Sequence, residues 1–166
     1  MVEQQFIELV NQNQGIVIKV CKLYCSDREM QRDLYQEVVL QLWKAFPKFR
    51  AEAKPSTWIY QIALNTVISD YRRNKKVGQK VELDEVFFEI PDDDTNTEQQ
   101  EQIDWLNKAI NVLNDTEKAI LMLYLEDKTH DEIAEIIGIS NGNVRVKLHR
   151  IQERLKKLKN ETMLWN

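Results

Sequence analysis

The sequence predicts an all-α fold of two small helical domains joined by an acidic flexible linker, with a helix-turn-helix in the second domain. Glycine and proline are scarce, at 4 and 3 of 166 residues, whereas the many turns of a β-sandwich or barrel favour both. Apolar residues also recur at helical spacing on both sides of one strongly acidic segment. We therefore expect domains at residues 1–76 and 105–166, with the linker at residues 77–104.

The first domain is expected to begin with a short helix, a break and a capped second helix. An apolar patch at residues 6–10 predicts the short helix, and Gly15 is expected to mark the break. Ser26 and Glu29 stand three positions apart, which predicts a capping box with Ser26 as the N-cap of the next helix. That helix is expected to end at Pro47, because proline interrupts helical hydrogen bonding.

The predicted linker is strongly acidic, whereas the two regions that it separates are basic or nearly neutral. Residues 1–76 carry 12 basic and 8 acidic groups, residues 77–104 carry 1 and 10, and residues 105–166 carry 10 and 9. A net charge of −4 would argue against nucleic-acid binding if it were evenly spread, but it is concentrated in the linker. The apolar residues of the linker are able to dock on a neighbouring surface; they are Val86, Phe87, Phe88 and Ile90.

Cysteine usage and the absence of targeting signals favour the cytoplasm. Cys21 and Cys25 would share one face of a helix, and we expect two reduced, partly buried thiols, because structural disulfides are rare in cytosolic proteins. A zinc site normally needs four ligands, and both histidines are over a hundred residues away. The N-terminus has no basic stretch before an apolar run, and no run approaches the roughly 18–20 residues that span a bilayer.

The second domain has the layout of a helix-turn-helix. Asn114 or Asp115 is expected to cap one helix, and Thr129 opens a capping box for a short helix that follows. Gly138 stands where a helix-ending glycine belongs, and Ser140 is expected to cap a long final helix. The same layout also occurs in simple helical hairpins, so further observations must distinguish the two.

The charge pattern of the final helix favours DNA binding. Seven basic residues and one acidic residue lie between positions 145 and 159. With the apolar stripe turned inward, the opposite face presents hydrogen-bonding groups near the helix start and cations further along. This arrangement suits a recognition helix in the major groove, although a solvated basic face is the plainer alternative. The candidate contacts are Asn141, Asn143, Arg145, Val146, Lys147, His149 and Arg150.

Val146 is expected to face outward on this otherwise polar surface. An apolar side chain in the major groove can contact the methyl group of a thymine. We therefore predict that Val146 lies against a thymine or the groove wall, and that it contributes to discrimination at one base pair.

Aromatic and basic residues alternate in the second half of the first domain. The rings of interest are Phe46, Phe49, Trp58 and Tyr60. A third helix is expected from Pro55 and ends in a basic run at residues 72–76. Unstacked bases stack on rings while cations follow the phosphates, so the pattern suits single-stranded DNA. The plainer alternative places most of these rings in the core, and periodicity cannot decide because the third helix is apolar on several faces.

Three segments carry a family resemblance: DLYQEVVLQLWKAFPKF at residues 33–49, STWIYQIALNTVISDYRR at residues 56–73, and DEIAEIIGISNGNVRVKLHRIQERLKKL at residues 131–158. In their order, spacing and intervening linker, they resemble a bacterial RNA polymerase sigma factor of the extracytoplasmic-function group. The resemblance covers nearly the whole chain. It implies two helical domains and a linker that threads polymerase channels otherwise occupied by RNA.

The resemblance also implies three binding surfaces. A helix bearing Asp33, Gln36 and Glu37 is implied to dock on a coiled coil in the largest subunit of core RNA polymerase. The final helix is implied to recognise the −35 promoter element as duplex DNA. A flipped base of the melted −10 element is implied to bind near the loop before the third helix. The candidate residues for that strand are Phe49, Lys54, Ser56, Thr57, Trp58, Tyr60 and Asn65.

The implied function is promoter-specific transcription initiation, with core RNA polymerase, promoter DNA and an anti-sigma factor as partners. No paired carboxylates, nucleophile–base set, phosphate loop or metal cluster is visible, so we expect no enzyme, cofactor or small-molecule substrate. Since no apolar run is long enough to span a bilayer, we also expect no membrane insertion. The alternative is a free-standing helix-turn-helix transcriptional regulator. It explains residues 105–166 equally well but leaves the aromatic–basic pattern and the acidic linker unexplained.

Overall fold

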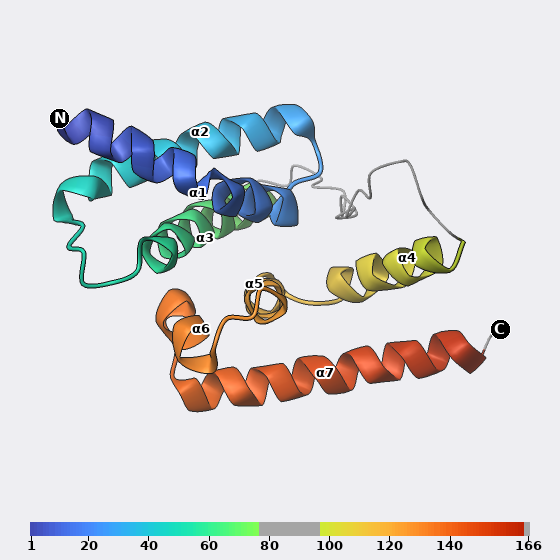
Figure 1. Ribbon diagram of the computed structural model, residues 1–166. Helices are drawn as coiled ribbons and strands as arrows, with labels where there is room; N and C mark the ends of the chain where they lie inside the picture. Colours follow the sequence, from blue (N-terminus) through green and yellow to red (C-terminus); the bar gives the residue numbers. More distant parts are fainter. Residues whose placement is uncertain (77–96, 165–166) are drawn as a thin grey trace. The chain divides into compact units, whose positions relative to one another are not determined.

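The computed structural model describes residues 1–76 and 97–164, which fold into helices joined by short connections (Figure 1). Contacts divide the chain into two compact units, Met1–Asp84 and Glu85–Asn166. The described part contains no β-strand, which confirms the all-α prediction. Among its helices, none combines the length and the apolar character that a membrane span requires.

The first unit packs three long helices around one apolar core. Helix α1 (Val2–Tyr24) packs on α3 (Pro55–Lys76) and on α2 (Arg28–Ala45), and α2 also packs on α3. A single 3-10 turn, η1 (Phe46–Lys48), follows α2. The apolar stripes of these helices are buried against one another, which supplies most of their stability. Core side chains that are at most 1% exposed include Val17, Val20, Val38, Leu42, Ile59 and Val67.

Helix α1 continues through Gly15, so the predicted break at that residue was wrong. The helix instead bends at Asn13, two residues earlier, without ending there. Asn13 has non-helical dihedral angles of φ −120° and ψ 15°. Its side-chain amide donates to the carbonyl of Leu9 at 2.9 Å, and such side-chain bonds to the backbone distort helices. A Cβ added at Gly15 would meet nothing within 4 Å, so this glycine simply lies on an open face.

The N-cap of α2 is Asp27, and the prediction of Ser26 was wrong by one residue. Oδ1 of Asp27 accepts the backbone amides of Glu29 and Met30 at 2.8 and 3.1 Å. A carboxylate at this position also interacts favourably with the positive end of the helix dipole. At the other end α2 stops at Ala45, before Pro47, as predicted.

The second unit contains four helices: α4 (Thr97–Asn111), α5 (Asp115–Leu125), α6 (His130–Ile137) and α7 (Asn141–Leu164). Residues 97–104 therefore form the first two turns of α4, and the prediction that they belong to the linker was wrong. Their glutamate and glutamine residues are good helix formers, and Gln100 donates to Asp104 one turn later, at 3.1 Å. The rest of the predicted linker, with its apolar residues Val86, Phe87, Phe88 and Ile90, lies outside the described residues.

The helix starts in the second unit follow the predicted caps. Asn114 forms a reciprocal capping box with Glu117, which decides between the two cap candidates for α5. Thr129 Oγ1 accepts the backbone amide of Glu132 at 3.2 Å and caps α6. The core beneath these caps is formed by α5, α6 and α7. Its most buried side chains include Ala119, Ile120, Leu123, Ile133, Val144 and Ile151.

Candidate functional site

Helices α6 and α7 form the predicted helix-turn-helix. Gly138 ends α6 in the left-handed conformation, with φ 82° and ψ 34°. The backbone amides of Gly138 and Ile139 both donate to the carbonyl of Ala134, at 2.9 and 3.1 Å. Ser140 Oγ then accepts the backbone amide of Asn143 at 3.1 Å and caps α7. The chain thus turns sharply between two helices, and the turn determines which side of α7 faces its own unit.

One side of α7 is buried and the opposite side faces solvent. Val144, Leu148 and Ile151 are at most 4% exposed, whereas Val146 is 48% exposed, as predicted. Lys147 is half-buried. The major groove is wide enough to admit an α-helix, so this outer side is accessible to duplex DNA. The predicted contacts that are exposed on it are Asn143, Arg145, Val146, His149 and Arg150.

Asn141 differs from the other candidate contacts on α7. It is half-buried, and its side-chain amide donates a hydrogen bond to the carboxylate of Asp131 in the first turn of α6. This bond spans the turn between the two helices and holds the start of α7. Asn141 therefore already has a partner within the protein, whereas Asn143 faces solvent.

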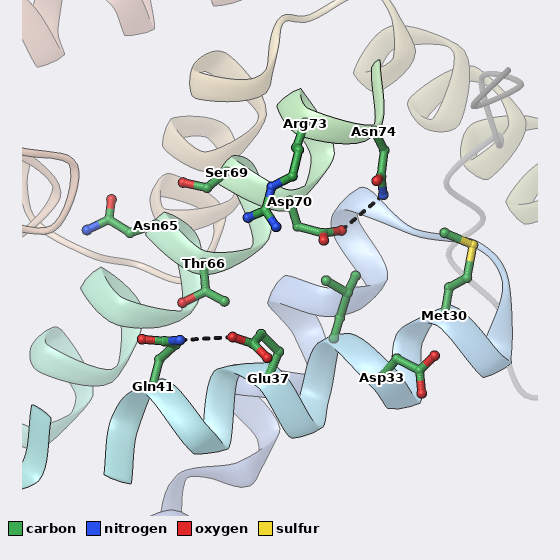
Figure 2. Close-up of a pocket in the computed structure, with 11 residues that line it drawn as sticks. Met30, Asp33, Glu37, Gln41, Asn65, Thr66, Ser69, Asp70, Arg73 and Asn74 are labelled. Carbon is green, nitrogen blue, oxygen red and sulfur yellow. Dashed lines mark hydrogen bonds between the residues drawn. The ribbon is translucent and has the colours of Figure 1, made fainter. Parts of the chain in front are cut away.

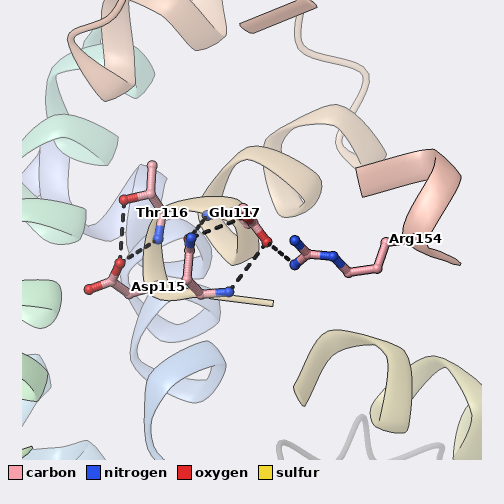
Figure 3. A network of polar contacts seen from close by, with 5 residues as sticks. Asp115, Thr116, Glu117 and Arg154 are labelled. Carbon is pink, nitrogen blue, oxygen red and sulfur yellow. Dashed lines mark hydrogen bonds and ion pairs between the residues drawn. The ribbon is translucent and has the colours of Figure 1, made fainter. Parts of the chain in front are cut away.

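Two of the seven cations on α7 form ion pairs within their own unit. Arg154 Nη1 lies 2.9 Å from Glu117 Oε2 on α5 (Figure 3), and Lys156 Nζ lies 3.7 Å from Glu153 Oε1. Glu117 and Arg154 are 37 positions apart, so no local spacing in the sequence indicates that they meet. Arg154 is consequently a weaker candidate for a phosphate contact than its sequence context suggests.

Aromatic rings gather at one end of the first unit, where α2, η1 and the start of α3 meet. The centroids of Phe49 and Trp58 lie 4.5 Å apart, and Phe46 lies 6.4 Å from each of them. Phe6 of α1 extends the cluster, with centroid distances of 5.0 Å to Trp43 and 5.3 Å to Phe46. We call these five residues the aromatic cluster. Phe46, Phe49 and Trp58 are half-buried, so the cluster is both part of the core and open to a ligand.

The structure separates the candidate residues for the melted strand into two groups. Thr57 and Tyr60 are 3% and 1% exposed, so their side chains belong to the core of the unit and are not accessible to a DNA base there. They fall on the buried side of α3, which its apolar composition did not reveal. The candidates that remain accessible are Phe49, Lys54, Ser56, Trp58 and Asn65.

A groove of about 610 Å³ lies between α2 and α3 (Figure 2). Asp33 and Glu37, two of the predicted polymerase contacts, line it from α2, and Asn65 and Arg73 line it from α3. The third predicted contact, Gln36, is exposed on α2 without lining the groove. The groove therefore brings two candidate polymerase contacts close to a candidate DNA contact. The sequence did not predict this proximity, because the residues lie far apart along the chain.

Other polar groups of the described residues offer little chemistry. No group of three or more His, Cys, Asp or Glu side chains in the described ranges could hold a metal ion. Cys21 and Cys25 are not joined in a disulfide, as predicted, and both are buried more fully than expected. Burial, with a smaller contribution from Cys25, raises the pKa of Cys21 from 9.0 to about 12, so this thiol stays protonated and unreactive near neutral pH.

These features define a class of protein: a helical chain with a helix-turn-helix of basic outer side in one unit and an accessible aromatic cluster in the other. Family models described as "Sigma-70 region 2" and "Sigma-70, region 4" match residues 9–77 and 103–155. RNA polymerase sigma factor HrpL of Pseudomonas syringae pv. syringae is 30% identical over 129 residues, which cover 75% of this chain and 70% of HrpL. The chain belongs to the sigma-70 family of RNA polymerase sigma factors, in its extracytoplasmic-function group.

Further similarities agree with this assignment. RNA polymerase sigma factor YlaC of Bacillus subtilis (strain 168) is 28% identical over 135 residues, with coverage of 78% of this chain and 77% of YlaC. Among solved structures, the sigma factor RpoE from Bartonella quintana, in complex with the anti-sigma factor NepR, has a TM-score of 0.70 at 20% identity and shows the same fold. The matched region covers 95% of this chain and 98% of the RpoE chain. A free-standing regulator is not favoured, because the region 2 match spans the first unit.

Proposed function

We propose that this sigma factor contacts core RNA polymerase with one surface and promoter DNA with two others, and thereby directs initiation to a defined set of promoters. The observation that carries the proposal is the solvent-facing side of α7, because it is polar and basic opposite the buried side chains of Val144, Leu148 and Ile151. Bacterial polymerase and chromosome share the cytoplasm, so the proposed role also places the protein there.

The outer side of α7 is proposed to recognise the −35 element as duplex DNA. Asn143, Val146 and His149 present side chains that suit base edges, and Arg145 and Arg150 present cations that suit phosphates. Each phosphate contact releases counterions, so binding through this surface is expected to weaken with salt by a slope of about 0.9 per contact.

Phe49 and Trp58 of the aromatic cluster, with their accessible neighbours, are proposed to bind the melted −10 strand. Phe49 and Trp58 offer ring faces for a base, while Lys54 and Asn65 are exposed on the same unit. Stacking of a base on an aromatic side chain contributes about 1–3 kcal/mol. That is of the same order as the few kcal/mol that unstacking a base from the duplex requires, so one or two stacked bases can offset strand opening.

The exposed face of α2 is proposed to dock on core RNA polymerase. Asp33, Gln36 and Glu37 are three and four positions apart and therefore share one side of the helix. All three are exposed, beside the buried stripe that contains Leu34 and Val38. Two carboxylates on one rigid helix face suit a basic partner surface.

An anti-sigma factor is proposed as a further partner. The similar sigma factors RpoE and CnrH were solved with the anti-sigma factor NepR and the cytosolic domain of CnrY, respectively. Both units of this chain expose large apolar side chains that a protein partner could cover. They include Leu40 and Trp43 in the first unit, and Val112, Tyr124 and Leu125 in the second.

Transcription with purified core RNA polymerase tests the proposal. Transcripts that rise on overexpression of the chain would be mapped, and their upstream regions used as templates. The expected result is initiation at these start sites only when the chain is added to core polymerase. Binding of the chain to an operator without any polymerase-dependent initiation would overturn the proposal and support a free-standing regulator.

A further inference from the structure

Glu117 connects the first turn of α5 to the middle of α7 (Figure 3). Its Oε2 lies 2.9 Å from Arg154 Nη1 and also accepts the backbone amide of Asn114 at 3.4 Å. Its Oε1 accepts the side-chain amide of Asn114 at 3.1 Å, and its own backbone amide donates to Asn114 Oδ1 at 2.8 Å. The capping box therefore holds the carboxylate in place, and Arg154 binds a fixed rather than a mobile anion.

The pair lies where the apolar contact of α7 with its unit becomes weaker. Ile151 is 1% exposed, whereas Leu155 and Leu158, further along the same stripe, are only half-buried. Arg154 follows Ile151 by about one turn of helix. An ion pair at this position constrains α7 where packing alone constrains it less.

The pair is also more shielded than an ordinary surface ion pair. The side chain of Glu117 is 16% exposed and that of Arg154 is 48% exposed. Partial burial and a charge-assisted hydrogen bond both strengthen such an interaction relative to fully exposed pairs. By contrast, Lys156 and Glu153 on α7 are 73% and 52% exposed at 3.7 Å, which is the geometry of a weak pair.

We propose that Glu117 and Arg154 are positioning residues, which set the orientation of the recognition helix for the −35 element. This inference rests on the proposed function of α7. Arg154 lies nine positions beyond Arg145, or about 14 Å along the helix axis, so a small rotation at the pair is transmitted to the candidate base contacts. Arg154 therefore acts through the orientation of α7 and not by neutralising a phosphate.

Three substitutions test the pair in the full chain bound to core polymerase. Glu117→Gln removes the charge but keeps a side chain that still serves a capping box. Arg154→Met removes the charge and keeps the apolar stem, whereas Arg154→Lys keeps the charge and serves as the conservative rescue. Initiation would be measured on a promoter obtained from the transcript mapping. A matched template with a mismatched bubble over the −10 element and no −35 element would be measured in parallel.

Glu117→Gln and Arg154→Met are each expected to lower initiation about fivefold on the duplex promoter, as expected for a partly shielded charge pair, and to leave the bubble template unchanged. The double variant is expected to be no worse than either single one, because both remove the same interaction. Arg154→Lys is expected to retain most of the activity. A melting curve for each variant would establish that it is folded.

Three results would overturn the inference. One is an additive loss in the double variant. Another is an equal loss on both templates, since that indicates a merely structural role. The third is a decrease of about 0.9 in the salt slope of binding for Arg154→Met, because that is the decrease expected when one phosphate contact is lost. Arg150→Met is the control that should show such a decrease. If the unsubstituted chain initiates on neither template, the proposed function fails instead, which is a separate outcome.

Discussion

At the scale of single residues, neighbours in the sequence have opposite environments, and this decides which of them a ligand can reach. Trp58 is half-buried at the edge of the aromatic cluster, whereas Tyr60 is 1% exposed. Two positions along an α-helix rotate a side chain by about 200°, so the two rings point in nearly opposite directions. The aromatic–basic pattern therefore mixes an accessible ring with a core ring.

Trp58→Ala is expected to reduce open-complex formation about tenfold, because stacking on one ring contributes about 1–3 kcal/mol per base. Trp43→Ala is the matched control. Trp43 belongs to the same cluster through Phe6, is 39% exposed, and is not among the proposed DNA contacts. Permanganate reactivity of unpaired thymines in the promoter measures the opening. Equal losses for the two variants would show that the cluster acts only through folding.

Val146→Ser is expected to reduce discrimination at a single base pair of the −35 element about fivefold. Val146 is 48% exposed on the side of α7 that is proposed to face DNA, and loss of its methyl groups would remove an apolar contact that favours a thymine. Initiation from a template library randomised over the −35 element measures the preference at each position. If every position keeps its preference, Val146 does not contribute to base recognition.

At the scale of helices, the ends were easier to predict than the breaks. Asn114, Thr129, Gly138 and Ser140 all occupy the predicted cap positions. Each has a side chain or a backbone conformation that favours a helix end, independently of the rest of the fold. The bend at Asn13 was missed because an asparagine inside a helix has several conformations open to it, and glycine gave the stronger local signal.

Asp27→Ala is expected to destabilise the first unit by about 1 kcal/mol, the usual effect of losing an N-cap. Ser26→Ala is expected to change stability by less than about 0.5 kcal/mol, as an exposed surface substitution does. Hydrogen exchange of the Glu29 and Met30 amides gives a direct measurement, because Asp27 accepts both. Faster exchange in the Ser26 variant instead would reassign the cap to the serine.

Gly138→Ala is expected to destabilise the helix-turn-helix by about 1–2 kcal/mol, because an L side chain is strained in the left-handed conformation that Gly138 adopts at φ 82°. Gly15→Ala is expected to stabilise the chain by about 0.5–1 kcal/mol, since alanine favours a helix interior and nothing obstructs its Cβ there. Denaturant unfolding followed by circular dichroism compares the two variants. Shifts of the same sign would contradict this reading of the two glycines.

At the scale of the whole molecule, the sequence allowed the fold class, the helix-turn-helix and the outward face of α7 to be predicted, because each depends on local periodicity and caps. It did not allow pairings between distant segments to be predicted. Glu117 meets Arg154 across 37 positions, and the groove between α2 and α3 joins Glu37 to Asn65. Such contacts depend on how helices pack, which a linear pattern does not encode.

The segregation of charge along the chain gives a prediction at this scale. Asp92 and Asp93 belong to the acidic segment at residues 77–104, which the family resemblance implies to thread polymerase channels otherwise occupied by RNA. We propose that its negative charge imitates nucleic acid against a basic channel. Replacing both with Asn is expected to lower initiation by about twofold or more. Replacing the exposed Glu3 and Glu8 of α1 with Gln changes the net charge equally and is expected to have no effect. Equal losses in run-off transcription would show that only the total charge matters.

The aromatic cluster has a consequence for the timing of promoter opening. Its rings already contact one another, with Phe49 and Trp58 at 4.5 Å, so the surface that is proposed to receive a base exists before the base arrives. The entropy lost on capture is then mostly that of the DNA strand, because the protein has little left to order. Opening should therefore respond more to how readily a promoter's bases unstack than to any rearrangement of this unit.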